Sequence, residues 1–166
     1  MTHPLHKPFD VFLDLDGVFA DFDGAIKKLT GFHPRELPKK ELWKTVYRKP
    51  DFFATLDLMH GWEILWSYFE PYDPIFLTGA PSGKSMQDQK IVWVGEKFGP
   101  KWAGKTVVLP RRDKQLHSGP RKLLLDDNQT NVAEWVSKGG YGILYKGDPH
   151  ATISEVEELR IAITTS

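Results

Sequence analysis

Residues 11–22 read V-F-L-D-L-D-G-V-F-A-D-F, an apolar run that ends in two aspartates, Asp14 and Asp16, followed by Gly17. The run is short and rich in aromatic and branched residues, which is typical of a buried strand over Phe9–Leu15. Open α/β sheets bind ligands outside the carboxyl ends of their strands. The two aspartates therefore mark a candidate ligand site.

Two carboxylates this close together are costly to bury unless a cation neutralises them. A strand that breaks at Gly17 can aim Asp14 and Asp16 at one point, although side chains alternate along a strand. Mg²⁺ binds one or two carboxylates together with phosphate oxygens, so it fits such a site. Two other interpretations stay open. Asp16 and Gly17 can simply begin a turn, or the segment can be a calcium loop, although an EF-hand needs Gly at its sixth position and Gly17 is fourth.

A second apolar run ends in the same way, because L-L-L-D-D-N at residues 123–128 places Asp126 and Asp127 after a buried stretch. Such a pair also occurs in turns, and Asp127 or Asn128 can cap a helix that begins near Thr130. Like charges from two separate strands converge only around a metal or phosphate site. The two acidic strand ends together favour that reading.

The rest of the chain alternates strand-like and helix-like stretches. We expect five strands, at Phe9–Leu15, Pro74–Leu77, Lys105–Leu109, Lys122–Leu125 and Tyr141–Tyr145. Between them apolar residues recur at helical spacing, as in Phe22, Ile26 and Leu29 after a possible cap at Asp21. This alternation predicts the α/β class, as a doubly wound three-layer α/β/α domain with a five-stranded parallel sheet.

One interval is too long for a single crossover between strands. It runs from Asp23 to Asp73 and contains Pro34, Pro38 and Pro50 between helical pieces. We therefore predict a small helical cap inserted after strand one, residues 23–69, and a catalytic α/β core made of residues 1–22 and 70–166.

Composition narrows the functional classes. The 166 residues suit one domain, and 22 basic residues balance 22 acidic ones, which argues against a polynucleotide partner. The absence of cysteine excludes disulfides and thiolate metal sites. The start, M-T-H-P-L-H-K-P-F-D, lacks the apolar run of a signal peptide, and no stretch approaches the length of a membrane span. We expect a cytoplasmic protein with no membrane partner, and we leave a homodimer open.

Four short motifs occur in an order that resembles the haloacid-dehalogenase-like phosphohydrolase superfamily: D-L-D-G-V, L-T-G, a lysine, and L-L-D-D. The resemblance spans about Phe9 to Tyr145. Longer stretches look like the 5'(3')-deoxyribonucleotidases within it, namely D-L-D-G-V-F-A-D-F, D-F-F-A-T-L, K-I-V-W-V-G-E-K-F-G-P, R-D-K and L-L-L-D-D. This implies a Mg²⁺-dependent phosphatase that hydrolyses phosphomonoesters, with a deoxynucleoside monophosphate as its small phosphorylated substrate.

The resemblance also implies roles for single residues. Asp14 would attack phosphorus and form an aspartyl-phosphate, and Asp16 would act as general acid and then as base. Asp14, the backbone carbonyl of Asp16, and Asp126 would hold the metal, with Asp127 just outside.

Phosphate binding would fall to the hydroxyl of Thr78, to the backbone of Gly79 and to one lysine. The candidates are Lys84, Lys90 and Lys114. Lysines on helices are usually solvated, whereas Lys114 follows the third strand at the right end of the sheet, so we favour Lys114.

Cap aromatics near Phe52 and Phe53, with Phe19 and Trp43, would sandwich a pyrimidine base, although core packing explains any single one of them. Two departures bear on the substrate: Gly79 stands where the family usually has Ser, and the cap is shorter than in mammalian members. Alternatives are the same chemistry on a sugar phosphate or a nucleic-acid 3'-phosphate, or a phosphate-binding domain without catalysis.

Overall fold

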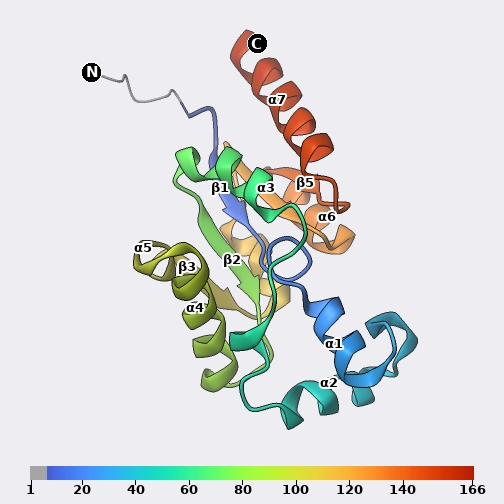
Figure 1. Ribbon diagram of the computed structural model, residues 1–166. Coiled ribbons are helices and arrows are strands. Elements are labelled where there is room, and N and C mark those ends of the chain that lie inside the picture. The colour runs from blue at the N-terminus through green and yellow to red at the C-terminus, as the bar shows by residue number, and fades with distance from the viewer. Residues whose placement is uncertain (1–6) are drawn as a thin grey trace.

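The computed structural model describes residues 7–166; residues 1–6, on which part of the expectation about a signal peptide rests, lie outside it. Five parallel strands form one sheet in the order β3-β2-β1-β4-β5 (Figure 1). Their bounds are β1 Asp10–Leu13, β2 Ile75–Gly79, β3 Thr106–Leu109, β4 Lys122–Asp126 and β5 Tyr141–Leu144. The predicted strands and fold class are confirmed.

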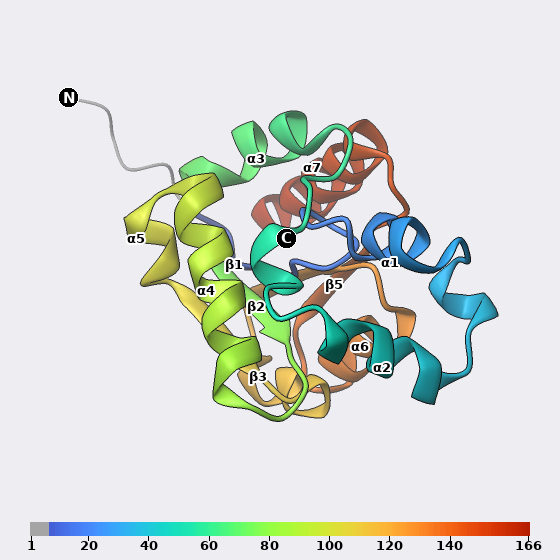
Figure 2. The same ribbon diagram turned by 60° about the horizontal axis from the view of Figure 1, so that its bottom comes forward.

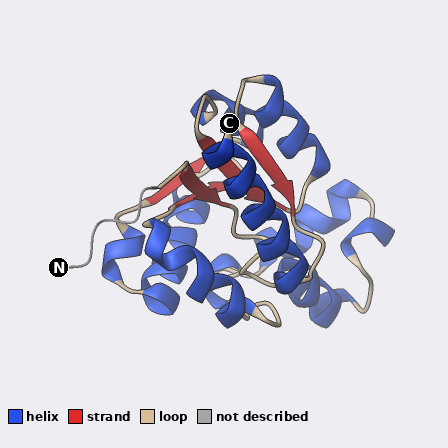
Figure 3. Ribbon diagram, turned by 90° about the horizontal axis from the view of Figure 1, so that it is seen from above, coloured by secondary structure: helices blue, strands red, loops and turns tan. Residues whose placement is uncertain are grey.

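Helices cover both faces of the sheet, so the fold has three layers (Figure 3). The α-helices are α1 Phe22–Thr30, α2 Lys39–Arg48, α3 Trp62–Phe69, α4 Lys84–Phe98, α5 Pro100–Ala103, α6 Gln129–Ser137 and α7 Pro149–Thr165. Short 3-10 helices are η1 Pro34–Glu36, η2 Phe53–Thr55, η3 Glu70–Tyr72 and η4 Arg111–His117. Two of the predicted caps are present: Asp21 accepts a hydrogen bond from Gly24 N at the start of α1, and Asn128 accepts one from Asn131 N at the start of α6.

The core is divided by the sheet because neighbouring strand residues point to opposite faces. Val11 and Leu13 belong to the larger apolar cluster, on the side of α3, α4 and α7. Phe12 belongs to a smaller cluster on the other side, where its ring lies 5.1 Å from that of Trp135 in α6. With both faces covered, the strands are buried throughout, which explains their short continuous apolar runs.

Helices α1 and α2 lie together beyond the carboxyl end of the sheet (Figures 1 and 2). Helix α3 lies in the layer beside the sheet, where Trp66 stacks on Phe76 of β2 at 5.6 Å and Tyr68 Oη donates to Glu157 of α7. The boundaries of the cap at residues 23 and 69 stay a prediction.

Within residues 7–166, no helix has the length and apolar character needed to cross a bilayer. The cytoplasmic location stays a prediction.

Candidate functional site

The topology brings the two acidic strand ends together. Strand β1 is central, and the chain reverses direction across the sheet between β1 and β4, which makes this the switch point where α/β sheets bind ligands. Leu13 pairs with Leu125, and the backbone N–H of Asp14 donates to Leu125 O at 3.0 Å. Asp14 and Asp126 therefore leave the sheet side by side, and both side chains are buried.

Asp14, Asp126 and Asp127 form an acidic cluster in which one carboxylate oxygen from each lies within 4.8 Å of the others. Mg²⁺ holds oxygens at about 2.0–2.1 Å, so two ligands on opposite sides of the ion stand about 4 Å apart. The cluster fits such an ion after a small contraction. It also places Asp127 among the candidate ligands, whereas the sequence predicted it just outside them.

The backbone conformation and the close packing beside this cluster require glycine at position 17. Its φ of 80° is one that L side chains rarely adopt, and a Cβ built there would lie 1.9 Å from Asp127 Oδ2. Glycine thus lets the loop after β1 approach the Asp127 carboxyl closely. Desolvation there, together with the charges of Asp126 and Asp16, raises the pKa of Asp127 to about 7.

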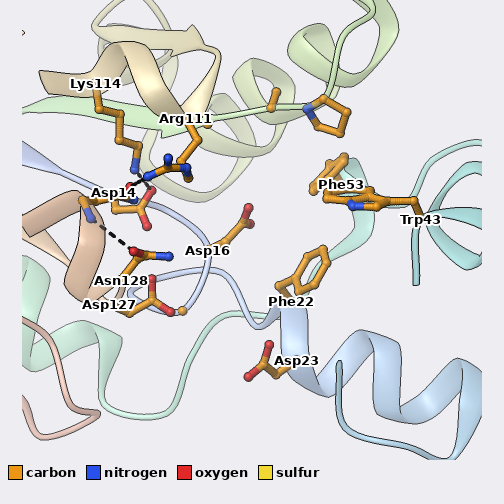
Figure 4. A pocket seen from close by; sticks show the side chains of 15 residues that line it. Asp14, Asp16, Phe22, Asp23, Trp43, Phe53, Arg111, Lys114, Asp127 and Asn128 are labelled. Atoms are coloured by element: carbon orange, nitrogen blue, oxygen red, sulfur yellow. Dashed lines mark hydrogen bonds and ion pairs between the residues drawn. The ribbon is translucent and has the colours of Figure 1, made fainter. Parts of the chain in front are cut away.

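Lys114 lies in η4, which follows β3, and its side chain reaches the same point. Its buried ammonium group donates to Asp14 Oδ1 at 2.7 Å (Figure 4). It also donates to Asp126 Oδ2 at 2.8 Å. Burial alone lowers the pKa of Lys114, but the charges of Asp14 and Asp126 outweigh it and raise the pKa, so this lysine stays protonated. Burial raises the pKa of Asp14, and Lys114 opposes that rise.

Two polar residues that the sequence analysis missed complete the surroundings of Asp126. Asn131 Nδ2 donates to Asp126 Oδ2 at 3.0 Å, and Arg111 Nη1 donates to Asn131 Oδ1 at 2.7 Å. The backbone N–H of Asn128 binds the other oxygen, Asp126 Oδ1, at 2.8 Å. The available signal was position: Asn131 lies in the first turn of the helix that follows the acidic pair.

Asp16 points away from the acidic cluster and toward α4. Its Oδ2 accepts a hydrogen bond from Lys90 Nζ at 2.5 Å, and Lys90 also donates to Thr78 Oγ1 at 3.0 Å. The expectation that helical lysines are solvated is wrong for Lys90, which is 2% exposed. It holds for Lys84, which is exposed and pairs with Asp88 at 2.6 Å.

Thr78 is fully buried beneath the site, where its hydroxyl binds Lys90, and Gly79 is the residue of this strand end that reaches the cavity wall. The cavity has a volume of about 330 Å³ and opens over the acidic cluster. Its lining residues are Asp14, Asp16, Gly17, Phe22, Asp23, Trp43, Phe53, Gly79, Ala80, Pro81, Arg111, Lys114, Asp127, Asn128 and Asn131.

The cavity has a charged end and an aromatic end (Figure 4). Phe22, Trp43 and Phe53 form the aromatic end; the rings of Phe22 and Phe53 are nearly parallel at 6.3 Å between centroids. Of the four aromatic residues predicted to contact a base, Trp43 and Phe53 line the cavity. The ring of Phe52 is buried against Phe53, and Phe19 lies in the core against Phe76. Phe22, which the sequence predicted as part of the apolar stripe of a helix, also lines the cavity.

No family model matches the sequence, and no curated protein matches it. Solved structures do share the fold. A haloacid-dehalogenase-like family hydrolase from Xanthomonas campestris aligns with a TM-score of 0.62 at 11% identity, over 96% of this chain and 95% of the other. A predicted phosphatase from Clostridium acetobutylicum aligns at 0.55 with 12% identity, over 95% and 99%.

A HAD family hydrolase from Deinococcus radiodurans, solved with bound phosphate and sodium, aligns at 0.50 with 16% identity, over 86% of this chain and 84% of the other. At these identities the similarity establishes that this chain shares the α/β fold of these three structures.

Proposed function

We propose that this protein is a Mg²⁺-dependent phosphatase in which Asp14 is the nucleophile. The observation that carries the proposal is the convergence of Asp14, Asp126 and Asp127 within 4.8 Å, beside the ammonium group of Lys114, at the switch point of the sheet. The fold shared with hydrolases, one of them solved with bound phosphate, supports the same reading.

The local charges favour a cation and a phosphate together. Four carboxylates, those of Asp14, Asp16, Asp126 and Asp127, line or underlie one end of the cavity. They face the ammonium groups of Lys90 and Lys114. Asp14, Asp126 and Asp127 would hold Mg²⁺, which would neutralise the excess negative charge and the charge of a phosphate oxygen.

In the proposed reaction a carboxylate oxygen of Asp14 attacks phosphorus, and the bond between phosphorus and the leaving oxygen breaks. Asp16 gives its proton to that oxygen, so the product leaves as an alcohol. Water then attacks the aspartyl-phosphate, Asp16 takes the proton back, and inorganic phosphate is released. Lys114 keeps Asp14 in place and offsets negative charge as it develops.

The aromatic end of the cavity supports a nucleotide as substrate. Phe22, Trp43 and Phe53 present ring faces on the cap side, while the reactive carboxylates lie at the opposite end. Stacking on a nucleobase contributes about 1–3 kcal/mol per base and tolerates several bases. We therefore propose deoxynucleoside monophosphates as the substrate class, in line with the resemblance of the motifs.

The test is phosphate release by the purified protein from a panel of deoxynucleoside monophosphates, sugar phosphates and an oligonucleotide with a terminal 3'-phosphate. The proposal requires release that depends on Mg²⁺, stops with EDTA and is lost in Asp14→Asn. Phosphate release from the sugar phosphates alone would change the proposed substrate class, whereas the proposed phosphatase reaction would stand. If no ester in the panel released phosphate in the presence of Mg²⁺, the proposed phosphatase reaction would be refuted as well.

A further inference from the structure

Lys90 is a buried cation whose carboxylate partner is Asp16, which lies outside the acidic cluster of Asp14, Asp126 and Asp127. It projects from the middle of α4, is 2% exposed, and has three partners: Asp16, Thr78 and the ring face of Phe53, whose centroid lies 4.6 Å from its Nζ. Burying an ammonium group is costly, and a buried ion pair seldom adds net stability compared with apolar residues of similar size. A contribution to stability is therefore a poor explanation for the buried pair of Lys90 and Asp16.

The position of Lys90 is fixed from several directions. Helix α4 is tied to the segment that leaves the cap, because Gln89 binds both Phe53 N and Pro50 O at 2.9 Å. One turn further on, Trp93 Nε1 donates to Leu56 O at 2.8 Å. Thr78 at the end of β2 supplies an acceptor that orients the ammonium group. The lysine thus has little freedom to move relative to the sheet.

The contact that this fixed ammonium group makes is with one oxygen of Asp16. Lys90 binds Oδ2, while Oδ1 is buried without a hydrogen-bond partner among residues 7–166. Asp16 also lines the reaction cavity. The carboxyl group of a residue that lines the cavity is therefore held against α4 through one of its two oxygens.

We propose that Lys90 is the positioning residue of the general acid. By holding Asp16 Oδ2 against α4, it fixes the carboxyl group that gives the proton to the leaving oxygen and later receives the proton of the attacking water. The inference rests on the proposed phosphatase function. Lys90 acts through Asp16, in contrast to Lys114, which binds the nucleophile itself.

This role predicts a dependence on the leaving group. An alkoxide, such as that of a nucleotide, needs a proton when the bond to phosphorus breaks, whereas para-nitrophenolate leaves without one. Loss of the positioning residue should lower kcat for the alkyl ester by about 100-fold, since misplacing a catalytic group by about 1 Å has an effect of that order. The aryl ester should lose less than about 5-fold, because the proton contributes little to its departure. A purely structural lysine would affect both esters alike.

The variant is Lys90→Met, which keeps the length of the side chain and removes the charge. Its matched control is Lys84→Met, which removes the same charge from an exposed site six residues earlier on the same helix. Lys90→Arg restores a cation and should recover part of the lost activity. If Lys90→Met does not fold, as judged by circular dichroism, Lys90→Gln takes its place in the same comparison, because it keeps an N–H donor.

The experiment measures kcat and KM for dUMP and para-nitrophenyl phosphate in the wild type, in these variants, in Asp16→Asn and in Lys90→Met/Asp16→Asn. We expect a loss confined to dUMP and to kcat, and a double variant no slower than Asp16→Asn alone. Equal losses on both esters, or additive losses in the double variant, would overturn the role of Lys90 while wild-type activity upheld the phosphatase. An inactive wild type would instead overturn the proposed function and the role of Lys90 together.

Discussion

Lys114 Nζ lies 2.7 Å from Asp14 Oδ1, although 100 residues separate the two in the chain. The same ammonium group binds Asp126, so one buried cation joins the ends of β1 and β4. Three carboxylates converge there. The site can be tested through this charge balance as well as through catalysis.

Lys114→Met should destabilise the protein, because it leaves Asp14 and Asp126 buried without their shared cation. Breaking a buried pair by removing one partner costs about 3–5 kcal/mol. Urea unfolding measures the loss, with Lys84→Met as the surface control, expected to stay within about 0.5 kcal/mol of the wild type. A loss below about 1 kcal/mol would mean that Lys114 does not hold the carboxylates together.

Mg²⁺ should raise the unfolding temperature, because a cation that binds the folded acidic cluster stabilises it. At a concentration of about 100 times Kd the gain is about 2.7 kcal/mol. The shift should disappear in Asp126→Asn and persist in Asp88→Asn, an exposed carboxylate on α4. Thermal melts with Mg²⁺ and with EDTA make the comparison; an equal shift in both variants would place the cation elsewhere.

Metal-free protein should lose stability as pH rises from about 4 to about 7. A carboxyl whose pKa is higher in the folded chain binds its proton more tightly there, so it favours folding at low pH and loses that contribution as pH passes the folded value. The raised pKa values of Asp127, about 7, and of Asp14 both act in this direction.

The measurement is the free energy of unfolding against pH in EDTA. Asp127→Asn should reduce the slope between these limits, and Asp88→Asn should leave it unchanged. An unchanged slope in Asp127→Asn would show that its carboxyl is not perturbed in the folded protein.

Trp43→Ala should raise KM for dUMP by about 10-fold, since one stacking contact contributes about 1–3 kcal/mol. KM for glycerol phosphate, which has no ring to stack, should change little. Phe32→Ala, an exposed aromatic of the same cap region, is the control. If KM for glycerol phosphate rises equally, Trp43 shapes the cavity without contacting a base.

The sequence predicted the sheet well because each strand is a short apolar run closed by Gly, Pro or Asp, a pattern with few alternatives. It also predicted that Asp14, Asp126 and Lys114 would meet, since parallel strands bring their carboxyl ends to one edge of the sheet. Lys90 was misjudged for a physical reason. Whether a helical lysine is solvated depends on what packs over that face, here Thr78 and Phe53, and spacing along the chain does not contain that information.

The aromatic residues illustrate the same limit. Phe52 and Phe53 are adjacent, yet only the Phe53 ring lines the cavity described here, while Phe22 joins it from the first turn of α1. Whether Phe52 or Phe53 faces the cavity depends on the turn of η2 and on the hydrogen bond that Phe53 N donates to Gln89 Oε1. Asn131 and Arg111 likewise reach Asp126 through contacts between α6 and η4 that form only after the sheet is assembled.

The most direct test of the central claim is a crystal structure of the protein with Mg²⁺ and beryllium fluoride, which mimics a phosphoryl group on aspartate. We expect beryllium on a carboxylate oxygen of Asp14 and a cation bound by Asp14 and Asp126, with Lys114 beside both. Crystals grown with both ions that show Asp14 unmodified, or a cation bound away from Asp126, would contradict it.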